Sequence, residues 1–531
     1  MNRSELLDAF NSGDVFDLVV VGGGATGLGV ALDAALRGFS VALLESHDFA
    51  SGTSSRSTKL LHGGVRYLAQ GNVALVREAL AERTTVMQLA PHLAQPLPFV
   101  MPSYAWWQTP FYGAGLTLYD LMAHRAGLGR TRFLNAAQTQ AVLPGVNTRG
   151  LKGGVQYWDG QFDDARLALT LARTAEQAGA KMLNHARVLS VQPASTVQDV
   201  ASVAMVDVVT GREAVIKARC VINATGVWVD ALRQSFVKGS AALRPMVRPS
   251  QGVHLVVDRT FMDGDHALLV PKTRDGRVLF AVPWLGKLVL GTTDTPRQDL
   301  PREPEPTTDE VDFILDEASR VLARPVRRED VRSVWVGLRP LVAPPDAQAG
   351  STQVLSREHT VVVDAGGLVT VTGGKWTTYR SMAEDVLARC FESGLLPRRS
   401  GGLTPRHRLY GAPAHVEAVG VPLHAPPGLH LYGEASREVM ACEGASIELG
   451  MGLTEAMVRY AVRSEYAQTV EDVLARRWRV LFLDAFRAEQ MAAAVADVLR
   501  AEGIAQPNEA DFIALCRQYQ TLPGGCAVKS S

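Results

Sequence analysis

Three glycines with the spacing Gly22-x-Gly24-x-x-Gly27 are the strongest chemical signal in the sequence. Glycines at this spacing permit a tight turn, a close approach of the backbone to a pyrophosphate, and close packing of a helix on a strand. Glu45 follows at a position where a carboxylate can accept a hydrogen bond from a ribose 2′-hydroxyl. The pattern therefore predicts binding of a dinucleotide that carries no 2′-phosphate.

The residues on either side of the glycines predict the elements that position them. We expect a strand over Leu18–Val21, a helix over Leu28–Leu36 and a second strand over Val41–Leu44, which ends at Glu45. Together they would form a βαβ unit, in which the N-terminus of the helix offers N–H groups and its dipole to the phosphates.

A loop rich in hydroxyl side chains, residues 52–67, follows soon after Glu45. A nicotinamide-dependent dehydrogenase has no need of such a loop, whereas hydroxyls placed here can reach a pyrophosphate and the polar edge of a flavin. The glycine pair later in the loop lets the backbone approach an isoalloxazine ring. The loop thus favours a flavin cofactor, with contacts from Thr53, Ser54, Ser55, Ser57, Thr58, Lys59, His62, Gly63 and Gly64.

Two later segments are predicted to return the chain to the cofactor. Strand-like runs over Val203–Val209 and Arg219–Val221 lead into an Ala-Thr-Gly turn, and Leu368–Tyr379 holds another strand, two glycines and several hydroxyls. The cofactor contacts that we expect from these returns are Ala224, Thr225, Gly226, Gly373, Gly374 and Thr377.

Short β-like runs over Gly252–Val257, Val278–Val282 and Leu288–Gly291 predict an antiparallel sheet inserted between the returns. The stretch Leu453–Glu502 has apolar residues at helical spacing and predicts a separate C-terminal domain. The boundaries that we expect are an oxidoreductase region over 12–395 and a helical domain over 400–531. Within the first region, the cofactor domain would take residues 12–90, 155–240 and 345–395, and the substrate domain 91–154 and 241–344.

The composition excludes several classes of protein. Lys+Arg and Asp+Glu each number 54, so the formal charge is zero. The chain therefore has no overall positive charge that would attract nucleic acid. The five cysteines are scattered without a CxxC pair, which argues against a disulfide framework, an iron–sulfur cluster or a metal site and favours a reducing cytosol. The N-terminal segment lacks the apolar core of a signal peptide.

The segment Thr84–Tyr119 has no Lys, Arg, Asp or Glu but is rich in aromatic residues, among them Trp106 and Trp107. Its five prolines prevent a membrane-spanning helix. The sequence leaves two interpretations open: a buried edge of the substrate domain, or a surface that dips into a bilayer, where Trp and Tyr favour the interface.

Several longer motifs carry a resemblance that spans nearly the whole chain. The loop GTSSRSTKLLHGGVRYL, the segment GLRPL (Gly337–Leu341) and TGGKWTTYR (Thr372–Arg380) resemble the FAD-dependent glycerol-3-phosphate dehydrogenases. The C-terminal stretch Val458–Ala485 is similar to the helical C-terminal domain of that family. Arg56 and Trp376 depart from the family pattern, and neither removes a hydroxyl or a charge that the chemistry requires.

The resemblance implies an α/β fold with an FAD-binding Rossmann-type domain, like that of glutathione reductase and the amino-acid oxidases. It also implies an inserted antiparallel β substrate domain and a helical C-terminal domain. The implied activity is oxidation of sn-glycerol 3-phosphate to dihydroxyacetone phosphate by hydride transfer to FAD, with electrons passed to quinone. The implied place is the cytoplasm, with peripheral contact to the inner face of the cell membrane.

Oxidation of a phosphorylated secondary alcohol needs a proton acceptor and cations that hold the phosphate. By analogy with the family, His254 lies nearest the reacting hydroxyl and Arg339 stabilises the developing alkoxide. His62 is the rival base, although its place in the flavin loop suggests a cofactor contact. The residues that we expect to bind substrate are Arg66, Tyr67, Arg357 and Lys375.

Three alternatives remain open at this point. A glycerol-3-phosphate oxidase would share every residue named here and would reduce oxygen to hydrogen peroxide. An amine or amino-acid oxidase would want a carboxylate-binding Arg and fewer phosphate cations. A flavin-binding regulatory or tRNA-associated module is disfavoured by the zero net charge. The oligomeric state, a homodimer included, stays open.

Overall fold

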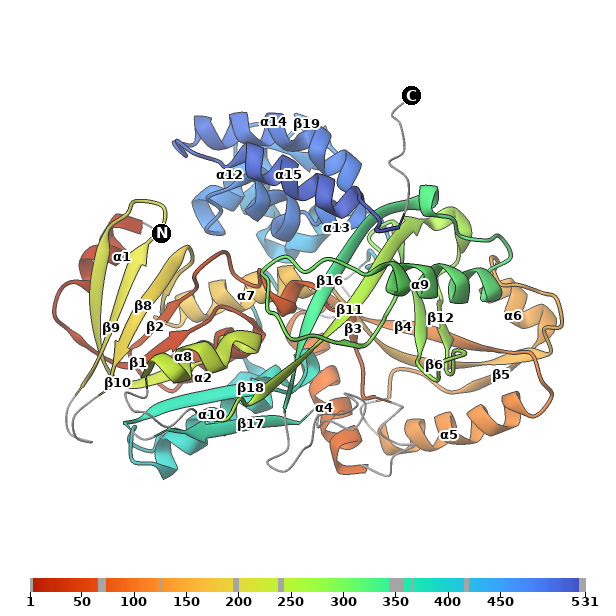
Figure 1. Ribbon diagram of the computed structural model, residues 1–531, viewed down its shortest axis with the longest axis horizontal. Coiled ribbons are helices and arrows are strands. Elements are labelled where there is room, and N and C mark those ends of the chain that lie inside the picture. The colour runs from red at the N-terminus through yellow and green to blue at the C-terminus, as the bar shows by residue number, and fades with distance from the viewer. Residues whose placement is uncertain are drawn as a thin grey trace.

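The computed structural model describes residues 3–64, 73–123, 127–193, 200–236, 243–342, 358–364, 366–414 and 420–524. Figure 1 shows three parts: a sheet with red and yellow strands at the left, a second sheet at the right, and blue C-terminal helices above them. The fold is therefore the α/β architecture that the sequence predicts, with a second β-rich unit and a helical C-terminal unit.

The first sheet is built around β1 (Val15–Val21), which pairs in parallel with β2 (Val41–Leu44) and β10 (Glu213–Asn223). The helix α2 (Ala25–Leu36) connects β1 to β2 and completes the predicted βαβ unit. The four residues of β2 are all buried, as expected of an apolar strand covered on both faces. With β7 (Lys181–Leu183), β17 (His359–Val363) and β18 (Leu368–Gly373), the strand order is β17-β18-β10-β1-β2-β7. This order brings the glycine turn and both later returns to one edge.

The remaining elements of this part complete the sheet and its cover. Strand β9 ends before Val209 because the Asp207 carboxylate accepts from the Val209 N–H in a turn. The strands are β7 (Lys181–Leu183), β8 (Ala186–Gln192), β9 (Ala201–Asp207), β17 (His359–Val363) and β18 (Leu368–Gly373). The helices are α1 (Arg3–Phe10), α7 (Asp164–Gln177), α8 (Val229–Phe236) and α10 (Tyr379–Glu392).

The second sheet is dominated by two long strands, β11 (Val247–Asp258) and β16 (Val331–Val342), which pair antiparallel along their length. In the described part of the chain, the one parallel pair of this sheet is β4 (Ala94–Ser103) with β12 (Ala267–Val270), so the predicted antiparallel pattern holds elsewhere. The register sets Ser250 opposite Arg339 and His254 opposite Trp335. Strand pairing thus places the two predicted catalytic residues on adjacent strands of the same sheet.

The other strands of the second sheet are β3 (Leu60–Leu61), β5 (Arg132–Asn135), β6 (Gly153–Phe162), β13 (Leu279–Trp284), β14 (Lys287–Gly291) and β15 (Thr295–Pro296). The helices of this part are α4 (Val73–Leu89), α5 (Gln108–Ala123), α6 (Ala136–Val142) and α9 (Thr308–Val321). Helix α9 begins with a capping box in which Thr307 and Glu310 satisfy each other's backbone N–H groups.

The C-terminal unit is helical, as predicted. Helix α14 begins at Ala485, and the carboxylate of the preceding N-cap residue, Asp484, accepts from the Arg487 N–H. The elements are α11 (Ser436–Met440), β19 (Glu448–Gly450), β20 (Leu453–Thr454), α12 (Glu455–Ser464), a π-helical turn over Asp472–Arg477, α13 (Val480–Leu483), α14 (Ala485–Ala501) and α15 (Glu509–Gln520). One hydrophobic core includes Leu18 and Leu43 of the first sheet and Leu474 and Trp478 of the C-terminal unit, so this unit packs directly onto the first sheet.

The two interpretations of the uncharged segment Thr84–Tyr119 apply to different parts of it. Strand β4 is largely buried, with Phe99 1% exposed, and belongs to the core. Trp106 is 82% exposed and Phe111 is 66% exposed, so the part around the start of α5 presents aromatic side chains to the outside. Among the described residues, no helix has the length and apolar character needed to cross a membrane.

Candidate active site

Two adjoining cavities run along the edge of the first sheet where the glycine turn and the returns meet. Their volumes are about 780 Å³ and about 270 Å³. Five residues line both cavities, which we therefore treat as one cleft with a Glu45 end and a His254 end: Gly24, Thr53, Ser54, Ala224 and Gly226.

The glycine turn fits the cradle that a pyrophosphate needs. Gly22 has φ +112°, and a Cβ there would lie 2.5 Å from the Ala224 carbonyl oxygen. Gly24 lines both cavities, and a Cβ there would lie 3.1 Å from the Ser54 Oγ. Gly27 acts differently: a Cβ would lie 2.0 Å from the Gly22 carbonyl oxygen, so this glycine permits close packing of α2 on the turn. These are the three roles that the spacing predicts.

Glu45 stands at the other end of the cleft from His254 and is held by backbone N–H groups. Its carboxylate accepts from the Gly23 N–H at 2.7 Å and from the His47 N–H at 2.9 Å. Burial raises the pKa of Glu45 above its usual value, and these two hydrogen bonds oppose the rise. Its position suits the predicted ribose contact.

The hydroxyl-rich loop begins with a short 3₁₀ turn over Thr53–Ser55 and lies against the glycine turn. The Ser54 hydroxyl accepts from the Ala25 N–H at 2.9 Å, at the first residue of α2. The Thr53 hydroxyl donates to the Leu338 carbonyl at 2.5 Å and so ties the loop to β16. Thr53, Ser54, Ser57 and Thr58 line the cleft, whereas Ser55 is buried behind it.

The side chain of Lys59, predicted to contact the cofactor, forms hydrogen bonds to other protein groups. Its ammonium is fully buried and donates to the Ser55 carbonyl and to Asp164, both at 2.7 Å. Burial lowers the pKa of Lys59 to about 7, while Asp164 opposes the change. Lys59 does not line either cavity, so it supports the hydroxyl-rich loop from behind.

The Gly63–Gly64 pair also has a packing role in the structure. A Cβ at Gly63 would lie 2.4 Å from the Tyr119 hydroxyl oxygen, which accepts from the Gly63 N–H at 3.0 Å. Gly64 has φ +79°, a conformation that glycine adopts readily. His62, just before this pair, lines the His254 end of the cleft.

Both later returns reach the cleft. Ala224 and Thr225 follow β10, and the Ala224 N–H donates to the Val21 carbonyl at 2.9 Å. Gly373, Gly374 and Thr377 line the His254 end. Trp376 lies beside them, and its indole N–H donates to the Ser54 carbonyl at 2.8 Å. This departure from the family pattern is thus part of the wall and holds the hydroxyl-rich loop.

His254 lies in the wall at the opposite end from Glu45. Its Nε2 is 3.0 Å from the Thr58 hydroxyl, and its ring stacks on Trp335 with 4.1 Å between centroids. Burial, followed by the positive charges of Arg339 and Lys59, lowers the pKa of His254 well below its usual value. The imidazole is therefore neutral near pH 7, the state in which a proton acceptor must start.

Arg339 and Lys375 bring positive charge to the same end of the cleft. The Arg339 guanidinium donates to the Thr293 carbonyl at 2.9 Å and pairs with Asp294 at 3.2 Å. The fork is therefore oriented by the segment after β14, with its side chain 25% exposed. The remaining predicted substrate residues, Arg66, Tyr67 and Arg357, lie outside the described residues.

Residues of the C-terminal unit line the Glu45 end of the cleft and were missed by sequence reasoning. Thr469, Glu471 and Asp472 are part of this wall, together with Phe512. They lie more than 400 positions after the glycine turn, and no local motif marks them. The Thr58 contact to His254 was missed for the same reason, because tertiary packing creates it.

The fold and the cleft define an FAD-dependent oxidoreductase. Residues 17–380 match the family described as "FAD dependent oxidoreductase", and residues 427–505 match the "C-terminal domain of alpha-glycerophosphate oxidase". An X-ray structure of the glycerol-3-phosphate dehydrogenase from Bacillus halodurans complexed with FAD superposes with a TM-score of 0.76. It is 28% identical and covers 98% of both chains. FAD is the cofactor of this family, and the glycine turn at the edge of the cleft fits it.

Curated relatives show which family within the FAD-dependent oxidoreductases the chain belongs to. A probable mitochondrial glycerol-3-phosphate dehydrogenase of Caenorhabditis elegans is 40% identical over 529 residues, which cover 94% of this chain and 72% of the relative. The mitochondrial glycerol-3-phosphate dehydrogenase of Homo sapiens is 39% identical over 531 residues, with the same coverage. The chain belongs to the FAD-dependent glycerol-3-phosphate dehydrogenase family.

Proposed function

We propose that the protein oxidises sn-glycerol 3-phosphate to dihydroxyacetone phosphate and passes the electrons to a membrane quinone. The observation that carries this proposal is the meeting of a neutral imidazole, His254, with two cations, Arg339 and Lys375, at one end of the FAD cleft. Cations bind a phosphate, and the imidazole accepts the proton that an alcohol loses on oxidation. The names of the relatives support the same substrate.

In this proposal the chain supplies binding, orientation and proton transfer. The glycine turn and the hydroxyl-rich loop hold FAD, which supplies the hydride acceptor. The Arg339 fork binds a phosphate oxygen of the substrate, and Lys375 adds a second positive charge beside the phosphate. His254 takes the hydroxyl proton, and the Thr58 hydroxyl, 3.0 Å from its Nε2, orients the ring. Arg66, Tyr67 and Arg357 stay predictions as further substrate contacts.

The proposed route to quinone requires contact with a membrane. We assign this contact to the α5 patch, which comprises Trp106, Trp107, Phe111, Leu118, Leu121 and Phe133, all large and exposed. Exposed aromatic groups of this kind favour the interface between water and lipid. Figure 1 shows α5 at the lower edge of the molecule, away from the C-terminal helices. The proposal places the protein at the cytoplasmic face of the cell membrane, attached peripherally.

An oxidase is the second candidate, because the C-terminal unit matches a domain named after alpha-glycerophosphate oxidase. An L-alpha-glycerophosphate oxidase structure from Mycoplasma pneumoniae, at 16% identity and a TM-score of 0.56, shares the fold. Oxidase and dehydrogenase would differ only in what takes electrons from the reduced cofactor.

Acceptor assays with the purified holoenzyme separate the two candidates. With glycerol 3-phosphate, the proposal predicts that a quinone analogue is reduced in step with substrate and that added lipid vesicles raise this rate. Oxygen consumption should be a small fraction of the quinone-linked rate. Stoichiometric oxygen consumption with formation of hydrogen peroxide would instead establish the oxidase.

A further inference from the structure

The loop over residues 45–50 shapes the Glu45 end of the FAD cleft. Its first residue, Glu45, accepts from the Gly23 N–H at 2.7 Å, and the Ala50 N–H donates to the Gly23 carbonyl at 2.9 Å. Both ends of the loop are therefore fastened to the glycine turn. Any shift of this loop would change the cradle that holds FAD.

Asp48 lies in the middle of this loop and is fully buried, with 0% exposure. Its carboxylate accepts from the guanidinium groups of Arg476 and Arg477, and from the Asn184 amide at 2.9 Å. Both arginines come from the C-terminal unit and are themselves buried. A buried carboxylate is tolerated only when it is paired, so the C-terminal unit supplies the charge that lets Asp48 stay inside.

A third arginine, Arg479, acts in the same way on the hydroxyl-rich loop. It donates to the Ser55 carbonyl at 2.7 Å and to Asp164 at 3.2 Å, and it is fully buried. Its φ of +63° is a left-handed conformation that side chains rarely adopt and that the surrounding contacts must offset. We call Arg476, Arg477 and Arg479 the arginine brace.

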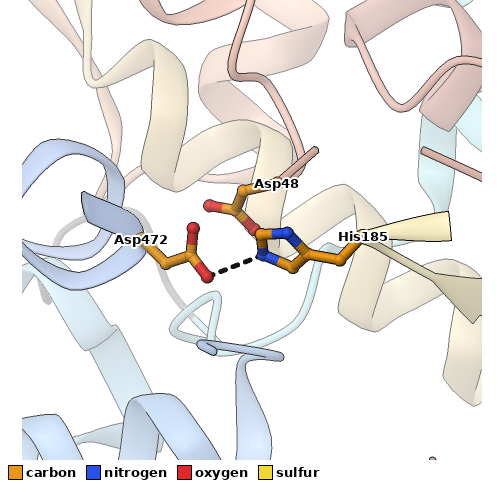
Figure 2. Close-up of side chains that lie close together, drawn as sticks. All are labelled: Asp48, His185 and Asp472. Carbon is orange, nitrogen blue, oxygen red and sulfur yellow. Dashed lines mark hydrogen bonds and ion pairs between the residues drawn. The ribbon is translucent and has the colours of Figure 1, made fainter. Parts of the chain in front are cut away.

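A second bridge joins the same units beside Asp48. Figure 2 shows the His185 ring pointing at Asp472, with 2.9 Å between Nε2 and the carboxylate. Possible ligand atoms of Asp48, His185 and Asp472 lie within 4.8 Å of one another, a spacing that a cation could use. Both carboxylates already pair with Arg476, so we assign the cluster to the ion-pair network.

We propose that the C-terminal unit is part of the FAD site, with the arginine brace as positioning residues that hold the two cofactor loops in their binding shape. The brace residues line neither cavity of the cleft, so they act through Asp48 and Ser55. When Arg477 is removed, Asp48 loses one of its two guanidinium partners, so the loop that carries Glu45 and Ala50 is held less firmly in its binding shape. This inference rests on FAD binding and is independent of the substrate and the electron acceptor.

The test is the rate at which the holoenzyme loses FAD on dilution, followed by the recovery of flavin fluorescence. Arg477→Met should release FAD at least about tenfold faster, since one charged hydrogen bond is worth about that factor. Asp48→Asn combined with Arg477→Met should bring the rate back toward wild type, because the buried carboxylate that lost a partner is then neutral and Arg476 keeps its pairs with Glu471 and Asp472. If Arg477→Met cannot be isolated folded, Arg477→Lys keeps the charge, loses the fork and should give an intermediate rate.

Arg459→Met is the matched control. Arg459 pairs with Glu502 at 2.8 Å and with Glu455 at 3.2 Å, so its partners all lie within the C-terminal unit. The substitution should lower Tm while leaving the FAD release rate unchanged. A purely structural role for Arg477 would lower Tm in the same way without faster release. An Arg477 variant that retains FAD like wild type would overturn the proposal.

Discussion

The imidazole of His254 lies almost flat on the indole of Trp335, with 17° between the ring planes. The two residues face each other across the β11–β16 pair, so strand register fixes the stack. The Lys59 ammonium lies 4.6 Å from a ring centroid of Trp335, which places a positive charge close to the imidazole. The stack and the Thr58 contact hold the ring in one orientation, and burial together with the charges of Arg339 and Lys59 lowers its pKa.

Replacing His254 with Asn should remove the proposed proton acceptor without emptying the cleft. His254→Asn should lower the rate of flavin reduction by glycerol 3-phosphate on the order of a hundredfold or more, the usual contribution of a general base. The pH dependence of that rate should also flatten, and FAD content should stay at wild-type level. Equal reduction rates in variant and wild type would assign the proton to another group, with His62 the next candidate.

Substitution of Arg339 tests the proposed phosphate binding at the His254 end of the cleft. Arg339→Lys keeps a positive charge but loses the fork, so kcat/KM for glycerol 3-phosphate should fall about tenfold to a hundredfold. Arg332→Lys is a control on the same strand, because Arg332 pairs with Asp258 at 2.8 Å and does not line the cleft. The control should keep wild-type kinetics. Equal losses in both variants would point to a general effect on β16.

A side chain at Gly24 should displace FAD. A Cβ there lies only 3.1 Å from the Ser54 Oγ and would stand where the two cavities join. Gly24→Val should therefore yield folded, colourless protein, as measured by the ratio of flavin to protein absorbance. Gly115→Ala, at a position with no atom within 4 Å of the added Cβ, should stay yellow. A yellow Gly24→Val protein would refute the proposed cradle.

The His185–Asp472 pair predicts a pH dependence of stability. Burial alone would lower the pKa of His185, but the Asp472 carboxylate raises it above its usual value. The pair therefore adds stability below about pH 6.5, the pKa of an unfolded histidine, and that stability is lost as pH rises through the higher folded pKa. The Tm difference between wild type and His185→Gln should shrink from pH 6 to pH 9. A difference that is constant or grows over this range would contradict the assignment.

Membrane binding through the α5 patch can be tested by vesicle sedimentation. Trp106→Ser combined with Phe111→Ser removes two exposed aromatic groups and should weaken binding to lipid vesicles by on the order of tenfold or more. Phe486→Ser is the control, because Phe486 is 45% exposed but lies on α14 in the C-terminal unit. Unchanged binding of the double variant would place the contact elsewhere.

The sequence could predict the βαβ unit because glycine spacing and apolar runs act locally, over a few residues. The resemblance placed both His254 and Arg339 at the reacting hydroxyl, but local spacing could not, because their approach depends on pairing of β11 with β16 across 85 positions. The motif could not show that Lys59 pairs with Asp164 behind the loop, because the two residues are 105 positions apart. The brace was missed because Arg477 and Asp48 are 429 positions apart, and a single arginine in a helical segment resembles a surface residue.

Anaerobic single-turnover reduction tests the central claim most directly, because no electron acceptor takes part. Holoenzyme is mixed with glycerol 3-phosphate or with glycerol, and the loss of flavin absorbance is followed. The account predicts rapid bleaching with glycerol 3-phosphate and a rate at least about a hundredfold lower with glycerol, which lacks the group that Arg339 and Lys375 bind. In Arg339→Lys that preference should shrink. Equal bleaching by both alcohols, or none by glycerol 3-phosphate, would contradict the account.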